Sequence, residues 1–251
     1  MEISFAQCTD KGLVREQNED FMGNARNDHL DAELFCVADG MGGYGAGDIA
    51  SKAVVKSVLQ EFYNLKRLPA EHLRDVVTDI FQVAQAELSQ FKISNNKAMM
   101  GTTLAVIIFY KRLVVCANIG DTRIYCLEGN HFTQKSYDHT LVNELVRSKS
   151  ITTSQAQNHP KKHVLSKALT GDDETLHPHI AIEALSNQNI YLVCTDGLYN
   201  MVDDSFLSSR LKDSSIYEAR DMLLQEAYRN GARDNITFQI IKADDNEVTL
   251  T

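Results

Sequence analysis

The chain has 251 residues, of which 43% are hydrophobic and only 3 are proline, which is enough apolar material for one sizeable core and provides no linker between two domains. Its 25 basic and 34 acidic residues give a formal net charge of -9, which argues against a nucleic-acid or membrane-surface partner, since both attract lysine and arginine patches. The 5 cysteines are odd in number and widely spaced, so we expect reduced core thiols in a cytoplasmic protein. We expect neither a signal peptide nor a membrane-spanning run.

The first half of the chain predicts one buried strand, two amphipathic helices and a run of hairpins. Residues 34–38 form a short apolar run that is typical of a buried strand. Apolar residues then recur at helical spacing over 49–62 and again over 73–88, which predicts a helical layer packed on a sheet. Strands with connections short enough for antiparallel hairpins follow over 102–110, 112–119, 123–128 and 131–133.

The second half begins with a change of pattern over residues 140–170, where short polar helices predict an inserted flap. Strands are then predicted over 179–182, 189–195 and 236–242, and helices over 206–211 and 216–229. Because the strands cluster and the helices come in separate pairs, we predict an α+β fold, with a central antiparallel β-sandwich flanked by helical layers in the order α-β-β-α. We expect a single domain over residues 1–243 and a polar tail over 244–251.

Two of the apolar runs end in an Asp-Gly pair, Asp39-Gly40 and Asp196-Gly197. A buried strand is a rigid arm that can place a carboxylate accurately, and the following glycine can turn sharply and bring a carbonyl oxygen to an ion. Carboxylates, carbonyls and waters are the ligands that hard divalent cations prefer. The pairs therefore indicate a metal site, although a single Asp-Gly more often marks a turn.

Seven short motifs follow one another from about Gly12 to about Phe238. They are GxxRxxNED from Gly12, VADGMGG from Val37, GTT from Gly101, GDTR from Gly120, DHT from Asp138, CTDGL from Cys194 and DNIT from Asp234. In this order they resemble the motifs of the metal-dependent protein phosphatases of type 2C, in their compact bacterial form. The segment between 151 and 169 is similar to that family's flap, which lies beside the catalytic cleft.

The resemblance implies two metal ions, Mn²⁺ or Mg²⁺, at one end of a β-sandwich. By the matching motifs, Asp39 would bridge the two ions and the carbonyl of Gly40 would bind the first. Asp196 and Asp234 would bind the second ion.

Four more residues are assigned by the same resemblance. Glu19 and Asp20 would lie at the rim of the site, where they would hold metal-bound waters or touch an ion directly. Asp121, together with Asp196, would offer a weaker third metal site, and Arg15 matches the family's phosphate-binding arginine. The candidate catalytic residues are thus Arg15, Asp39, Asp196 and Asp234.

The implied reaction is hydrolysis of phosphoserine and phosphothreonine in proteins. A phosphomonoester carries about two negative charges near pH 7 and repels an anionic nucleophile. Two cations would reduce that repulsion, activate a bridging water and clamp the attacking and leaving oxygens, while the planar fork of Arg15 would bind the phosphoryl oxygens. We expect phosphoproteins and a cognate Ser/Thr protein kinase as partners, and a monomer.

The sequence departs from part of the family at Met41, where some members carry a histidine that protonates the leaving alkoxide. Methionine cannot donate a proton, so our hypothesis is that a metal-bound water does so. The flap also carries four lysines, which either contact acidic phosphopeptides or form a solvated basic face. They are Lys149, Lys161, Lys162 and Lys167.

Other functions are less well supported by the sequence. The alternative is a non-catalytic scaffold or sensor of the same fold that binds phosphoproteins, and the complete set of metal-site aspartates argues against it. A metal-dependent nuclease is opposed by the acidic charge balance. No cysteine is followed by an arginine at the spacing of a cysteine-dependent phosphatase, and no P-loop motif is present.

Overall fold

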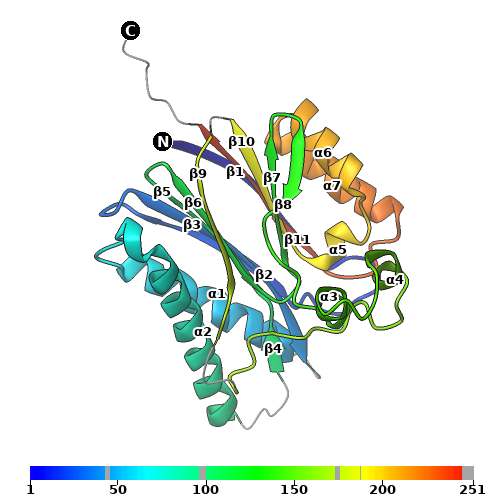
Figure 1. The fold of residues 1–251 in the computed structure, drawn as a ribbon, viewed down its shortest axis with the longest axis horizontal. Helices are drawn as coiled ribbons and strands as arrows, with labels where there is room; N and C mark the ends of the chain where they lie inside the picture. The colour runs from blue at the N-terminus through cyan, green and yellow to red at the C-terminus, as the bar shows by residue number, and fades with distance from the viewer. Residues whose placement is uncertain (43–45, 96–99, 173–175, 187, 245–251) are drawn as a thin grey trace.

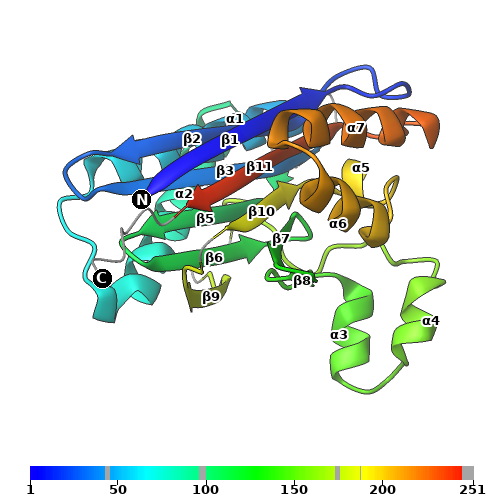
Figure 2. The ribbon, with the colours of Figure 1, turned by 90° about the horizontal axis from the view of Figure 1, so that it is seen from above.

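The computed structural model describes residues 1–42, 46–95, 100–172, 176–186 and 188–244, so the predicted tail lies outside the described residues from residue 245 on. Two antiparallel sheets pack face to face and carry helices on both outer sides (Figures 1 and 2). The predicted α+β class and the α-β-β-α order of layers are therefore confirmed.

The first sheet has the strand order β1-β11-β10-β7-β8. Its strands are β1 (Glu2–Asp10), β11 (Ile236–Asp244), β10 (Asn189–Cys194), β7 (Arg123–Glu128) and β8 (His131–Gln134). The second sheet has the order β2-β3-β5-β6-β9, and β4 pairs with the end of β3. Its strands are β2 (Asp20–Asn27), β3 (Ala32–Gly42), β4 (Met100–Thr102), β5 (Leu104–Tyr110), β6 (Leu113–Ile119) and β9 (His179–Ala184).

Two details of the sheets differ from the prediction. The edge strands β1 and β2 have no predicted counterpart. The single strand predicted over 102–110 is divided at Thr103 into β4 and β5. The reason is that the Thr103 hydroxyl, rather than a backbone carbonyl, accepts the hydrogen bond of the Asp39 amide at 2.9 Å.

A compact apolar layer between the two sheets fixes the strands. Phe35, Phe109 and Tyr191 form a row of edge-to-face rings, with centroids 6.1 and 5.4 Å apart. Successive side chains of a strand point to opposite faces, so Leu34 of β3 packs toward the helices while Phe35 packs between the sheets. Because β3 is buried on both faces, its tip is held as rigidly as the core itself.

Helices cover the outer face of each sheet (Figure 1). On the second sheet lie α1 (Ala46–Asn64) and α2 (Leu73–Asn95), with a 3₁₀ turn at Ala70–His72 between them. On the first sheet lie α5 (Asp196–Tyr199), α6 (Asp204–Asp213) and α7 (Ile216–Arg229). Helix α7 begins at a capping box, in which Ser215 and Glu218 each accept a hydrogen bond from the other's amide, so its start is defined by local sequence.

The flap, residues 140–170, projects from the sandwich in Figure 2. It contains the short helices α3 (Leu141–Arg147) and α4 (Thr153–Gln157), whose starts are capped by Thr140 and Thr152. The isolated β-bridge between Thr140 and Leu165 joins the two ends of the flap, and the one between Thr102 and Leu169 attaches the flap to the body. Because Thr102 of β4 pairs with Gly40 of β3, the second bridge brings the end of the flap next to the end of β3.

All five cysteines are free, and four of them are buried. Burial raises the pKa of Cys36 to about 12 and that of Cys8 to about 11, so these thiols are unreactive core residues, as predicted. Within the described ranges, no helix combines the length and the apolar character needed to cross a membrane.

Candidate metal centre

A cavity of about 1050 Å³ lies between the flap and one end of the sandwich. Its acidic lining consists of Glu19, Asp39, Asp121, Asp196 and Asp234. Its basic lining consists of Arg15, Lys162, Lys167 and Arg233, with His163 beside them. Every predicted site residue except Asp20 therefore lines this one cavity.

Asp39 is held by its backbone and has a free carboxylate. Its amide donates to Thr103 Oγ1 and its carbonyl accepts from the Thr103 amide and from Thr102 Oγ1, each at 2.9 Å. In the described part of the chain, no donor hydrogen-bonds to the carboxylate oxygens. Burial, followed by the charge of Asp20, raises the pKa of Asp39 well above the usual value. A nearby cation would stabilise the charged form of this carboxylate and offset its burial.

The two Asp-Gly pairs need glycine for a reason other than a turn. A Cβ on Gly40 would overlap the carbonyl oxygen of Gly47 in α1, and a Cβ on Gly197 would overlap the carbonyl oxygen of Asn235. Neither glycine has a positive φ, so neither position needs glycine for a left-handed backbone conformation. Glycine is required because another backbone segment passes directly beside each of these two glycines.

Asp196 and Asp234 lie next to each other at the ends of neighbouring strands. Asp196 follows β10 as the first residue of α5, and Asn200 Nδ2 donates to its Oδ2 at 3.1 Å. Asp234 precedes β11 and accepts at Oδ2 from Arg15 Nη2 at 2.7 Å. Burial, followed by the charge of Asp234, raises the pKa of Asp196. These two carboxylates therefore compete for positive charge, and Arg15 supplies only part of it.

Asn235 is a functional residue that our sequence reasoning did not single out. Its Nδ2 donates to the carbonyls of Lys11 at 3.0 Å and Gln17 at 2.9 Å, and its Oδ1 accepts from the Glu19 amide at 2.8 Å. The loop that these bonds hold carries Arg15. The signal for Asn235 was available, since it follows Asp234 in the last motif.

Glu19 and Asp20 are neighbours in sequence but occupy different places. Glu19 lines the cavity. Asp20 is only 4% exposed, is not part of the cavity lining, and accepts a hydrogen bond from Thr195 Oγ1 at 2.9 Å. It faces Asp39 across the β2–β3 pair, and burial raises its pKa to about 7. Asp20 thus lies behind the metal-site candidate rather than at its rim, because β2 turns its first side chain into the sandwich.

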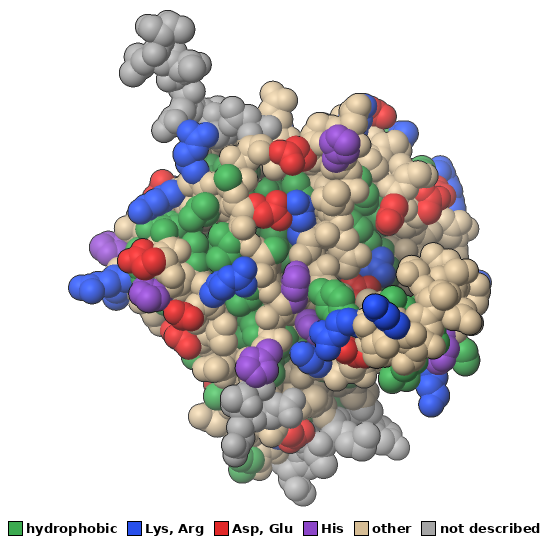
Figure 3. Space-filling view, in the orientation of Figure 1, with side chains coloured by type: hydrophobic (Ala, Val, Ile, Leu, Met, Phe, Trp, Pro, Cys, Tyr) green, Lys and Arg blue, Asp and Glu red, His purple; other side chains and the backbone are tan. Residues whose placement is uncertain are grey.

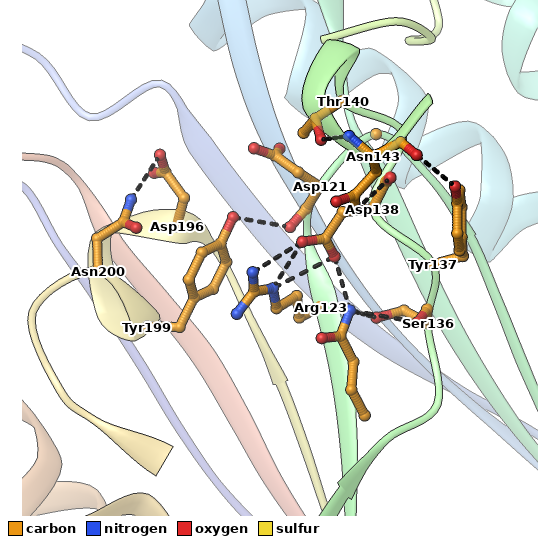
Figure 4. Close-up of polar contacts among 12 residues, drawn as sticks. Asp121, Arg123, Ser136, Tyr137, Asp138, Thr140, Asn143, Asp196, Tyr199 and Asn200 are labelled. Carbon is orange, nitrogen blue, oxygen red and sulfur yellow. Dashed lines mark hydrogen bonds and ion pairs between the residues drawn. The ribbon is translucent and has the colours of Figure 1, made fainter. Parts of the chain in front are cut away.

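Asp121 is tied to the base of the flap by the network in Figure 4. The Tyr199 hydroxyl donates to the carbonyl of Asp121 at 3.1 Å, and the guanidinium of Arg123 lies 3.7 Å from the centroid of the Tyr199 ring. Arg123 in turn donates to the Asp138 carboxylate from Nη2 at 2.8 Å and from Nε at 3.0 Å. Burial, followed by the charge of Asp196, raises the pKa of Asp121 to about 7.

The same network reaches the flap through Asn143, and a second bond holds the residue just before the flap. Asn143 of α3 donates from Nδ2 to the carbonyl of Asp138 at 3.0 Å (Figure 4). The ring of the next residue, His139, accepts at Nδ1 from the Gly120 amide at 3.2 Å. The base of the flap and Asp121 are therefore positioned by one set of contacts.

Side chains alone do not complete a metal site here. Among the described residues, no group of three or more histidine, cysteine, aspartate or glutamate side chains is arranged to hold an ion. Mutual repulsion keeps like charges apart, and Mn²⁺ and Mg²⁺ readily add backbone carbonyls and waters to a few carboxylates. The cluster of buried acids with raised pKa values fits such cations in charge and in donor type.

Comparison with known proteins decides the family. The sequence model described as protein phosphatase 2C matches residues 14–225 of the chain. The chain belongs to the protein phosphatase 2C family. This type 2C phosphatase is 34% identical over 237 residues to the serine/threonine phosphatase stp of Listeria welshimeri, and the match covers 93% of each chain.

Solved structures agree with this assignment. The serine/threonine phosphatase of S. agalactiae has a TM-score of 0.89 at 26% identity, over 97% of this chain and 100% of that one. The catalytic domain of the serine/threonine protein phosphatase PstP in complex with two manganese ions has a TM-score of 0.82 at 30% identity, over 97% and 99% of the two chains. The predicted family and protein phosphatase activity are confirmed.

Proposed function

We propose that this type 2C phosphatase removes phosphate from phosphoserine and phosphothreonine in proteins, with two Mn²⁺ ions at the floor of its cavity. The observation that carries the proposal is the Asp39 carboxylate, which lies at a rigid strand tip, lines the cavity and receives no hydrogen bond from the described residues. The names of the relatives support the reaction, and the manganese ions of the PstP structure support the choice of metal.

For the two ions we propose the ligands implied by the motifs. Asp39 would help to hold both ions, the Gly40 carbonyl would help to hold the first, and Asp196 and Asp234 would hold the second. All four residues line the same cavity, which supports this assignment. Mg²⁺, which also prefers oxygen ligands, is the proposed alternative metal.

Three further acids have supporting roles in the proposal. Glu19 reaches the cavity and holds water at the edge of the site. Asp20 faces Asp39 across the β2–β3 pair, and its negative charge contributes to the raised pKa of Asp39. Asp121 and Asp196 influence each other's charge and offer a weaker third metal site.

The protein's own side chains bind and orient the phosphate. Arg15 uses one nitrogen for Asp234, which leaves the rest of its guanidinium fork for the phosphoryl oxygens. When bound, the two cations would offset the charge of the phosphate and activate water for in-line attack. Met41 lines the cavity and cannot donate a proton, so we retain the hypothesis that water protonates the leaving oxygen.

The remaining proposals concern the setting of the enzyme. We expect a Ser/Thr protein kinase to act on the same phosphoproteins, and the phosphatase to work as a monomer with one catalytic domain over residues 1–243. The five free thiols support a location in the reducing cytoplasm. A non-catalytic scaffold has no supporting observation, since the phosphate-binding arginine and the metal-site aspartates all line one cavity.

A phosphothreonine peptide assay tests the proposal. Wild type should release phosphate with Mn²⁺ and lose this activity with a chelator. The Asp39→Asn variant should be nearly inactive, whereas the matched Asp204→Asn variant, which changes an exposed aspartate of α6 outside the cavity, should retain wild-type activity. Equal activity of Asp39→Asn and wild type would refute the proposal.

A further inference from the structure

The mouth of the cavity has positive side chains that the phosphatase reaction does not use. Lys162 and Lys167 line it from the flap, and Arg233 lines it from the loop before β11. All three are exposed, and none of their charged side-chain groups forms an ion pair or hydrogen bond within the described part of the chain. Arg15 is different, because it forms an ion pair with Asp234.

What distinguishes these three side chains is their position at the cavity, not the overall charge of the protein. The chain has a net charge of -9, so exposed basic side chains around this acid-lined cavity are not explained by the overall charge of the protein. Other flap lysines do not share the position: Lys149 and Lys161 are exposed but do not line the cavity. Figure 3 shows basic side chains over this face, beside acidic ones that lie deeper.

The electrostatic influence of the flap extends into the site. Burial, followed by the charge of Lys167, lowers the pKa of His139. Yet no cavity carboxylate lies within 4.0 Å of Lys162, Lys167 or Arg233 as an ion-pair partner among the described residues. The cavity floor therefore does not neutralise these three side chains.

A substrate would supply the missing negative charges. Its phosphate must reach the floor next to Arg15, so the residues on either side of the phosphorylated one pass between the flap and the loop that carries Arg233. Side chains two or three residues away lie roughly 7–10 Å further along an extended chain. That is the zone between the floor and the exposed mouth.

We propose that Lys162, Lys167 and Arg233 select phosphoproteins that carry aspartate or glutamate within about three residues of the phosphorylated serine or threonine. This inference rests on the proposed phosphatase function and names the substrate class of the same site. The lysines and the arginine act on recognition, and Arg15 acts on the phosphate itself.

Two phosphothreonine peptides that differ only in flanking glutamates or glutamines test the proposal. With Mn²⁺ at low salt, wild type should favour the glutamate peptide about tenfold in kcat/KM, because each exposed charge pair contributes roughly two- to five-fold. The preference should shrink in about 0.5 M salt, where screening removes interactions beyond a few ångströms. Equal kcat/KM values for the two peptides would overturn the proposal.

The variants Lys162→Gln, Lys167→Gln and Arg233→Gln should each reduce the glutamate preference roughly two- to five-fold. Lys161→Gln is the matched control, because it removes a neighbouring flap lysine outside the cavity lining and should keep the wild-type preference. A preference that all three variants retain, or that Lys161→Gln loses equally, would contradict the assignment.

Binding gives the same comparison without turnover. Peptides with a non-hydrolysable phosphonate in place of phosphate should show the glutamate preference in fluorescence anisotropy, and the three variants should reduce it. Catalysis of both peptides without discrimination would refute only the selectivity. Failure of Mn²⁺-loaded wild type to hydrolyse either peptide would refute the proposed function, and the anisotropy result would then decide the selectivity on its own.

Discussion

Acidification should destabilise the fold through His139 at the base of the flap. This imidazole is only 4% exposed and accepts a hydrogen bond at Nδ1 from the Gly120 amide. Burial, followed by the positive charge of Lys167, lowers its pKa from 6.5 to about 4. Protonation would also place a ring N–H against the amide that now donates to it.

The sign and the size of the effect follow from linkage. The unfolded chain takes up the proton near pH 6.5, whereas His139 in the folded protein stays neutral until about pH 4, so stability is lost as the pH falls between these values. By pH 4.5 the loss through this group amounts to about 2.5 kcal/mol relative to pH 7, since one pKa unit corresponds to about 1.4 kcal/mol.

Urea unfolding of wild type and His139→Asn at pH 7 and pH 4.5, without metal, measures this quantity. Asparagine can still accept the Gly120 hydrogen bond but cannot take up a proton. The cavity carboxylates titrate in both proteins, so the difference between the two pH dependences isolates His139. We expect wild type to lose about 2.5 kcal/mol more than the variant. Identical pH dependences would refute the reasoning.

Three substitutions test the other contacts. Gly197→Ala should lower the free energy of unfolding by about 2 kcal/mol or more in urea, because its Cβ would overlap the Asn235 carbonyl. Asp138→Asn should lower the free energy of unfolding by about 3 kcal/mol in the same assay, because it leaves the half-buried Arg123 without its carboxylate partner. An unchanged unfolding midpoint in either variant would contradict these contacts. Arg15→Lys should lower kcat/KM for a phosphothreonine peptide at least about tenfold, but shift stability by less than about 1 kcal/mol, since this ion pair is half exposed. Wild-type kcat/KM would show that the planar fork is not used.

Strongly periodic elements could be predicted from the sequence because one face of each is buried. Helix α7 has the predicted bounds, since its apolar stripe faces the sheet and a capping box marks its start. Strand β7 also has its predicted bounds, with a turn at Gly129 directly after it. In these elements local sequence and tertiary packing agree.

The edge strands could not be predicted in the same way. Strand β2 begins at the buried Asp20 and ends at Asn27, whose side chain is buried because it donates to helix carbonyls such as that of Phe62. Neither residue favours a strand by itself. Pairing with β3 along its whole length makes this segment a strand, and pairing is a property of the fold rather than of the local sequence.

The site was predictable as far as its acids lie at strand ends. Asp39 and Asp196 follow apolar runs that the sequence displays openly. The flap residues that line the cavity could not be predicted. Lys161 and Lys162 are alike in sequence, and only the bridge from the flap to Thr102 determines which of them faces the cavity. The same holds for Gly197, whose role depends on the carbonyl of Asn235, which is distant in sequence.

The most direct test of the central claim is to count the Mn²⁺ ions that the protein binds. Titration calorimetry and electron paramagnetic resonance on metal-free protein should give two tightly bound ions for wild type and for the Asp204→Asn control. Asp39→Asn should lose tight binding of both ions, because the proposed bridge contacts each of them, while its thermal unfolding without metal should still show a folded protein. Two ions bound to Asp39→Asn with wild-type affinity would contradict the account.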